Sequence, residues 1–196
     1  KIKAAIKKAN EKGNYSCEKM AEKALDWNGR TTQMLSMIEK HMYDAKEVDR
    51  HPKVENSERG VIAESIYSNV DYFNLKIFGI SMQVNGVYFG IDKLGHFVTC
   101  GRDYFKTYSR LIKRKKSKNY AMKRALKRGV ISELTYYGYM ISGVFSYADL
   151  ESNYQGLLFA KSFCEGPSPL LTLDQNNKWK LRKDIDITPY VNPNWD

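Results

Sequence analysis

The sequence predicts a mainly α-helical fold with one small β-hairpin. Apolar residues recur at helical spacing, most clearly as one stripe within residues 91–112: Leu94, Phe97, Val98, Tyr104, Phe105, Tyr108 and Leu111. Asn85-Gly86, the pair preferred in type I′ turns, follows an alternating apolar and polar segment and so predicts the hairpin. With 196 residues, 42% of them hydrophobic, the chain can bury the core of one domain, with or without a helical extension.

The N-terminal half predicts three further helices and a loop. A helix over 1–12 ends at Gly13, and Ser16 is the expected N-cap of the next helix, which breaks near Trp27-Asn28-Gly29. Residues 43–60 are polar with mixed charge, which predicts a long loop. A short helix over 61–73 carries Glu64.

The C-terminal half predicts a last helix and an extended tail. The helix covers 152–163 and stops at Gly166-Pro167. Short edge strands are expected at 179–182 and 185–187. Gly101, within the helix of the apolar stripe, is expected to allow close approach of a neighbouring element.

The positive charge is concentrated in a basic segment, residues 113–128. The chain has a net charge of +10, and this segment holds nine Lys/Arg and no acid, which leaves +1 on the rest. Such a segment favours a polyanionic partner, namely nucleic acid, anionic lipid or an acidic cell-wall polymer. A solvated helix start that only aids solubility is the alternative interpretation.

Cysteine usage and hydropathy bear on the compartment. Cys17 and Cys164 lie near element ends and could pair, which would leave Cys100 as a free thiol. The absence of a run of about 18 apolar residues predicts no membrane-spanning segment. Because the sequence begins at Lys1, we expect that a leader was removed or the chain trimmed, and that the protein is a secreted or periplasmic monomer.

Glu133 is the most informative single residue. It is the only acid between Asp103 and Asp149, and it stands at helical spacing on an apolar row that includes Met122, Leu126, Gly129, Tyr137 and Met140. Burying an unpaired carboxylate costs several kcal/mol, so such a residue must be paired, protonated or functional. Desolvation would raise its pKa and make it a candidate general acid.

A second carboxylate is expected on a polar turn after this helix. Asp149 and Glu151 follow Glu133 by roughly 15 to 20 residues, an arrangement that could flank a glycosidic bond. Ser146 and Asn153 belong to the same polar cluster. Tyrosines close by could line a saccharide groove, although several of them must be core: Tyr136, Tyr137, Tyr139, Tyr147 and Tyr154.

Asp92 and His96 lie four residues apart on the helix of the apolar stripe. They permit three interpretations: a structural ion pair, part of an active-site network, or half of a metal site. Because no second soft ligand stands near His96, we expect no metal and no cofactor.

Two stretches resemble known families. ESIYSNVDYFNLKIFGISMQV, residues 64–84, is similar to the goose-type lysozyme and lytic transglycosylase pattern, although its Gly-Ile-Ser-Met-Gln is one residue longer and lacks the leucine. IDKLGHF and GVFSYADLESNYQGLLF resemble secreted proteins of predatory bacteria that include a lysozyme acting on deacetylated peptidoglycan. IDKLGH with Ser146, Asp149, Asn153 and Gly156 also resembles small membrane proteins of the VanZ type.

The lysozyme resemblance implies a lysozyme-like α+β fold and a glutamate general acid at a helix end. It divides the chain into an N-terminal helical segment (1–42), a catalytic body (43–166) and a C-terminal tail packed on that body (167–196). Glu133 and Glu64 are the candidate acids, with Asp149 and Glu151 as alternative second carboxylates. The expected network or substrate-binding residues are Asp92, His96, Ser146, Asn153, Tyr137 and Tyr147.

The expected activity is therefore hydrolysis of peptidoglycan or a related polysaccharide by two carboxylates. The alternative is a protein without enzymatic activity that binds nucleic acid or an anionic surface through residues 113–128. Against nucleic acid, the sequence carries no helix-turn-helix, zinc or Gly-x-x-Gly signature. No serine or cysteine stands in a recognisable nucleophile elbow.

Overall fold

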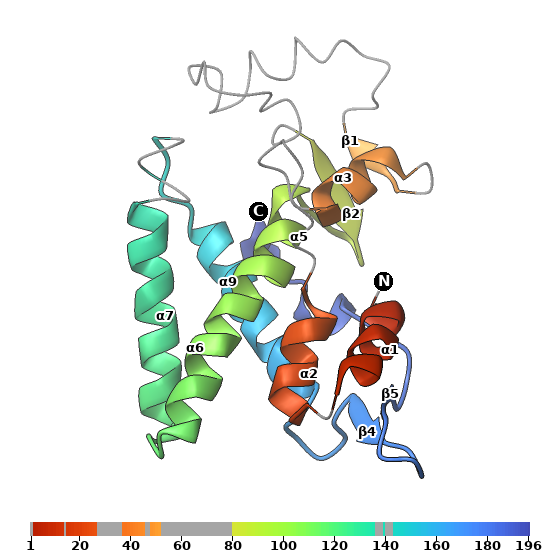
Figure 1. Cartoon of the computed structure of the whole chain (residues 1–196). Coiled ribbons are helices and arrows are strands. Elements are labelled where there is room, and N and C mark those ends of the chain that lie inside the picture. Colours follow the sequence, from red (N-terminus) through yellow and green to blue (C-terminus); the bar gives the residue numbers. More distant parts are fainter. Residues whose placement is uncertain are drawn as a thin grey trace.

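The computed structural model describes residues 2–13, 15–26, 37–45, 48–51, 80–135, 139 and 143–196. Helices dominate and two small antiparallel sheets accompany them, which confirms a mainly α fold with a small hairpin (Figure 1). The larger helices are α1 (Ile2–Lys12), α2 (Cys17–Ala24), α3 (Met37–Asp44), α6 (Gly101–Lys113), α7 (Lys118–Leu134) and α9 (Tyr147–Ser162).

One long helical rod organises the described chain. It begins with α5 (Asp92–Gly95), passes through the π-helical turn η2 (His96–Cys100) and continues as α6. The predicted apolar stripe is buried along this rod except for Leu111, which is half-buried against the core. The π-helical turn lies where the rod carries His96, and such turns are frequent at functional sites.

Helices α7 and α9 pack against this rod, and α6 lies between them in Figure 1. The rod and α9 come together at Gly101 and Gly156, where a Cβ on Gly101 would lie 2.5 Å from the Cα of Gly156. No side chain larger than hydrogen fits there, so the predicted close approach at Gly101 is confirmed. This contact brings the polar residues of the two helices within reach of one another.

The N-terminal helices are held to the body by the predicted disulfide between Cys17 and Cys164. The side chain of Ser16 accepts a hydrogen bond from the Lys19 N–H, which confirms it as the N-cap of α2. The bridge spans 147 residues of sequence. A loop of that length corresponds to about 5 kcal/mol of stabilisation in the chain-entropy model.

The hairpin forms at the predicted turn. Strands β2 (Ser81–Val84) and β3 (Val87–Gly90) pair with Met82 opposite Phe89, and both turn residues, Asn85 and Gly86, have positive φ. Phe89 is fully buried and contacts Trp195 near the C-terminus, with ring centroids 5.0 Å apart. The hairpin is thereby anchored to the core beside the start of α5.

The C-terminal residues pack along the body. Strands β4 (Leu171–Leu173) and β5 (Trp179–Leu181) form the second sheet, and β5 packs against α1. Two short 3-10 turns follow, η3 (Thr188–Tyr190) and η4 (Pro193–Trp195), and both pack against α9. Trp195 is completely buried there.

Three local predictions need correction. Asp149 and Glu151 lie in the first turns of α9 rather than on a turn, because Ser146 caps the helix earlier than expected. The strand expected at 185–187 does not form, and the short strand β1 (Arg50–His51) pairs with β2 inside the predicted loop. The predicted helix over 61–73 and the break at Trp27-Asn28-Gly29 lie outside the described residues.

No helix among the described residues has the length and hydropathy needed to cross a bilayer.

Candidate functional site

A buried cluster of charged and polar side chains lies where the rod, α7 and α9 meet. The rod contributes Asp92, Lys93 and His96, α7 contributes Glu133, and α9 contributes Asp149 and Asn153. Five of the six residues are no more than 8% exposed, and the His96 side chain is 15% exposed. The structure thus brings together residues that the sequence separates by up to 61 positions.

The start of α9 places two of these residues and ties them to Glu133. The hydroxyl of Ser146 accepts a hydrogen bond from the Asp149 N–H at 3.1 Å, the usual contact of an N-cap serine. The Ser146 N–H donates to Oε1 of Glu133 at 3.2 Å. Ser146 therefore links the carboxyl of α7 to the first turn of α9.

Asp149 is the centre of the charge network. Its Oδ1 lies 2.6 Å from the Lys93 ammonium, and its Oδ2 lies 3.3 Å from Nε2 of His96. The same ammonium lies 2.7 Å from Oδ2 of Asp92. Two cations thus face two carboxylates in a place where an unpaired charge would be costly.

A hydrogen-bond chain fixes the orientation of His96. Asn153 donates through its amide nitrogen to the Tyr104 hydroxyl at 3.2 Å, so its carbonyl oxygen is the atom 3.1 Å from Nδ1 of His96. A carbonyl oxygen can only accept a hydrogen bond, so Nδ1 of His96 carries the proton of this contact. Nε2 is therefore directed at Asp149.

Below about pH 7 the site holds its two central carboxyl groups in different protonation states. Burial raises the pKa of Glu133 to about 7, and the negative charge of Asp149 acts in the same direction. Burial would also raise the pKa of Asp149, but the charges of His96 and Lys93 outweigh it and lower that pKa below its usual value. Glu133 is therefore available as a proton donor near neutral pH, beside a carboxylate that stays ionised.

Both cations remain charged in spite of burial. Burial alone would lower the pKa of His96, but the carboxylate of Asp149 raises it to about 10. Burial likewise acts to lower the pKa of Lys93, and Asp92 and Asp149 raise it above its ordinary value. With Lys93, His96, Asp92 and Asp149 charged and Glu133 protonated, the cluster has no net charge.

Three of these residues also have the chemistry of a metal-ligand set. One oxygen or nitrogen atom from each of Asp92, His96 and Asp149 lies within 4.8 Å of the others. The Lys93 ammonium, however, contacts both carboxylates and supplies the positive charge that a metal ion would bring. The ammonium would therefore compete with a metal ion for both carboxylates.

The other predicted site residues are placed differently. Glu151 accepts hydrogen bonds from Asn192 and Gln155 through its Oε1, so its carboxylate serves the packing of the C-terminal residues on α9. Tyr147 is 79% exposed at the start of α9, immediately after Ser146. Glu64 and Tyr137 lie outside the described residues.

Lys93, in the cluster, and Tyr104, which contacts it through Asn153, were not predicted as site residues from the sequence. Lys93 stands four residues before Phe97 and eleven before Tyr104, on the face of the apolar stripe. That is the signal that identified Glu133, a charged residue at an apolar position, and it would have identified Lys93 as well.

Comparison with known proteins gave no match to a protein family, to a curated protein or to a solved structure.

Replacement of Lys93 by methionine should lower the free energy of unfolding by about 3 to 5 kcal/mol, because Asp92 and Asp149 would be left without their buried counter-charge. Chemical denaturation at pH 7 measures this decrease. Lys106→Met is the matched control, because Lys106 pairs with Asp103 in an exposed position and should cost less than about 1 kcal/mol. Equal decreases in the two variants would contradict the charge network described above.

The raised pKa of Glu133 should make folding less favourable as the pH rises. Below its unfolded value of 4.5 the group is protonated in both states and contributes nothing. Between pH 4.5 and about 7 the unfolded state ionises first, so stability falls and reaches a cost of about 3 kcal/mol above that range.

Glu133→Gln removes this cost, so its stability relative to wild type should improve by up to about 3 kcal/mol between pH 4 and pH 8. Denaturant unfolding of both proteins across that pH range measures the difference. Glu11→Gln, on the exposed side of α1, should follow the wild-type curve. A pH-independent difference for Glu133→Gln would show that Glu133 has an ordinary pKa.

Proposed function

We propose that the protein is a glycoside hydrolase that cleaves peptidoglycan, with Glu133 as the general acid. The observation that carries this proposal is the pair Glu133 and Asp149, whose surroundings move their pKa values in opposite directions. Two carboxyls whose pKa values are moved apart in this way usually supply the acid and the anionic partner of glycoside hydrolysis.

In this mechanism Glu133 donates its proton to the leaving glycosidic oxygen. Asp149 remains ionised, since Lys93 and His96 hold it so, and its charge stabilises the positive charge that develops on the sugar ring. Water then adds to that ring carbon and gives up a proton to the Glu133 carboxylate, which restores the acid. Glu64, which the lysozyme resemblance implies, remains the alternative acid or the second carboxylate that activates water. Glu151 is the weaker alternative because Asn192 and Gln155 already engage it.

One exposed aromatic side chain next to the cluster supports a saccharide as substrate. Tyr147 is 79% exposed and contacts Phe145 edge to face, with ring centroids 5.2 Å apart. Ser146, which binds Glu133, lies between these two residues in the sequence. An amphipathic ring of this kind presents an apolar face to a sugar and keeps a hydroxyl for its polar groups.

The architecture and the disulfide agree with this proposal. A mainly helical body with a hairpin ahead of the site is compatible with a lysozyme-like fold, which is part of the proposal. Disulfides persist in oxidising compartments, so the Cys17–Cys164 bridge supports a secreted or periplasmic location. Peptidoglycan is found there.

A second candidate function is binding of a polyanion through the basic segment. All nine of its Lys/Arg side chains are exposed, on the end of α6, the following turn and one side of α7. Among the described residues, the only ion pair that this segment makes within 4.0 Å is from Lys118 to Glu165, at 3.9 Å. The segment therefore retains most of its charge for a nucleic acid or an acidic surface.

Release of soluble sugar from native and chemically deacetylated peptidoglycan tests the hydrolase. Glu133→Gln should reduce the rate by roughly a hundredfold or more, because a positioned general acid contributes on that order. Wild-type activity should fall as the pH rises above about 7, where Glu133 loses its proton. Glu151→Gln tests the weaker alternative and should retain most of the activity, because Asn192 and Gln155 already engage that carboxylate.

Glu64→Gln decides whether that residue shares the role of Glu133. Circular dichroism of each variant verifies that the fold is intact. If the wild type releases sugar from neither substrate, the proposed activity is wrong, and Glu133 is a structural carboxyl.

Duplex DNA binding at two salt concentrations tests the second candidate. If the basic segment binds DNA, Lys115→Gln/Lys116→Gln/Lys123→Gln should reduce the slope of log affinity against log salt concentration. The expected reduction is about 0.9 for each phosphate that is no longer neutralised. Lys8→Gln/Lys12→Gln/Lys183→Gln removes the same charge elsewhere and should leave that slope unchanged. Equal effects of the two triple variants would rule out a specific role for residues 113–128.

A further inference from the structure

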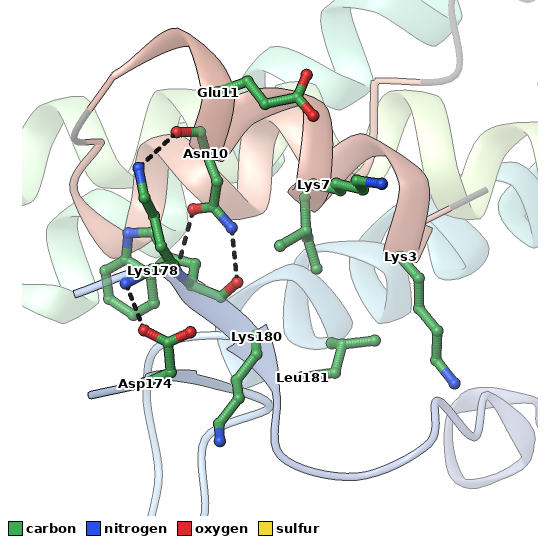
Figure 2. Close-up of a pocket in the computed structure, with 10 residues that line it drawn as sticks. Lys3, Lys7, Asn10, Glu11, Asp174, Lys178, Lys180 and Leu181 are labelled. Carbon is green, nitrogen blue, oxygen red and sulfur yellow. Dashed lines mark hydrogen bonds between the residues drawn. The ribbon is translucent and has the colours of Figure 1, made fainter. Parts of the chain in front are cut away.

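A groove separates α1 from the β4–β5 hairpin, away from the cluster around Glu133. Its volume is about 540 Å³. Helix α1 supplies one wall and the hairpin the other, and Figure 2 shows lysines on both sides. The lining residues are Lys3, Ile6, Lys7, Asn10, Glu11, Asp174, Lys178, Trp179, Lys180 and Leu181.

The two walls are fixed to each other through Asn10. Its side chain donates to the Trp179 carbonyl at 2.8 Å and accepts from the Trp179 N–H at 3.1 Å, and its own carbonyl accepts from the Lys178 ammonium at 3.0 Å (Figure 2). The indole N–H of Trp179 donates to the Tyr15 carbonyl at 2.8 Å. The groove is therefore pre-formed, which is the usual condition of a ligand site.

The charge of the groove favours an anion. Four lysines line it, against two acids, Glu11 and Asp174. Lys3 pairs with Asp184 at 2.9 Å, so the lining keeps a small positive excess from Lys7, Lys178 and Lys180 over the two acids. Lys7 and Lys180 are exposed on opposite walls. A carboxylate within the groove could approach lysines from both sides.

The floor of the groove favours a sugar. Trp179 is half-buried with its N–H satisfied, so the indole keeps its orientation and offers an apolar face beside Leu181. An extended acidic peptide would instead seek the outer edge of β5. Asn10 already occupies both hydrogen-bonding groups of Trp179 on that edge, which disfavours strand addition.

We propose that this groove is a secondary binding site for a glycan strand that carries carboxylates, with one sugar ring on Trp179 and the acidic groups on Lys7 and Lys180. The proposal rests on the proposed function, because it assigns to the hydrolase a substrate-holding surface apart from Glu133. Such a surface would keep the enzyme on the polymer between cleavage events and raise its effective concentration there.

The test is titration of the protein with glycan strands freed of stem peptides, which keep one lactyl carboxylate per disaccharide, at low salt. Tryptophan fluorescence reports on the Trp179 platform, and Trp179→Phe identifies its part of the signal. Lys7→Glu/Lys180→Glu should weaken binding about tenfold, since two exposed lysines that pair with the ligand are replaced by residues of opposite charge.

The matched control is Lys8→Glu/Lys183→Glu, which changes the net charge equally at exposed positions outside the groove lining. It should bind as the wild type does. A neutral chitin oligosaccharide of the same length and polyglutamate of the same charge should both bind more weakly than the strands.

Three results would overturn the proposal: equal weakening in both double variants, equal binding of polyglutamate, or a fluorescence change that survives Trp179→Phe unaltered. Glu133→Gln is titrated in parallel, since it should slow sugar release by roughly a hundredfold or more and leave binding in the groove intact. Binding without hydrolysis by the wild type would refute the proposed activity alone, whereas hydrolysis without groove binding would refute the groove alone.

Discussion

The ion pair between Lys93 and Asp149 is the interaction on which the candidate site depends. It joins the rod to α9 at 2.6 Å in a place where neither charge has enough water to be stable alone. His96 and Asp92 complete the arrangement on either side of it. Burial raises the pKa of the neighbouring Glu133 carboxyl, and the negative charge of Asp149, which these cations hold ionised, raises it further.

Close packing of the helices makes this arrangement possible. Gly101 and Gly156 let the rod and α9 approach until their backbones touch, and Gly129 of α7 packs against the hydroxyl of Tyr104. Tyr104 in turn accepts the hydrogen bond of Asn153, which orients His96. Packing and proton placement are therefore linked, since a methyl group at Gly129 would displace Tyr104 and with it the support of the imidazole.

Much of this fold follows from local sequence signals. The hairpin at Asn85-Gly86, the cap at Ser16 and the apolar stripe of the rod depend on residues near in sequence, so their predictions were confirmed. The prediction of a strand at 185–187 was wrong, because alternation of apolar and polar residues over three positions is too short a signal to specify strand pairing. Asp149 was expected on a turn, but Ser146 caps α9 and places Asp149 in the first turn of that helix.

The site itself was only partly predictable. Glu133 stood out because an acid on an apolar row has few explanations, and Asp149, His96 and Asn153 were named from polar spacing. Their meeting depends on the tertiary contact between Gly101 and Gly156, which sequence spacing does not encode. Lys93 was overlooked because a lysine is ordinarily exposed, and its burial is explained only by two carboxylates from different helices.

The neutrality of the cluster constrains what a substrate of the proposed hydrolase would have to carry. The charges of Lys93 and His96 balance those of Asp92 and Asp149, so proton donation by Glu133 would leave one uncompensated negative charge at a residue that is 2% exposed. A positive charge arriving at the same moment would remove that cost. In the proposed reaction, the developing oxocarbenium ion supplies such a charge, and an amine on a deacetylated sugar would add to it. The same electrostatics that keep Glu133 protonated at rest therefore favour its ionisation in a transition state of this kind.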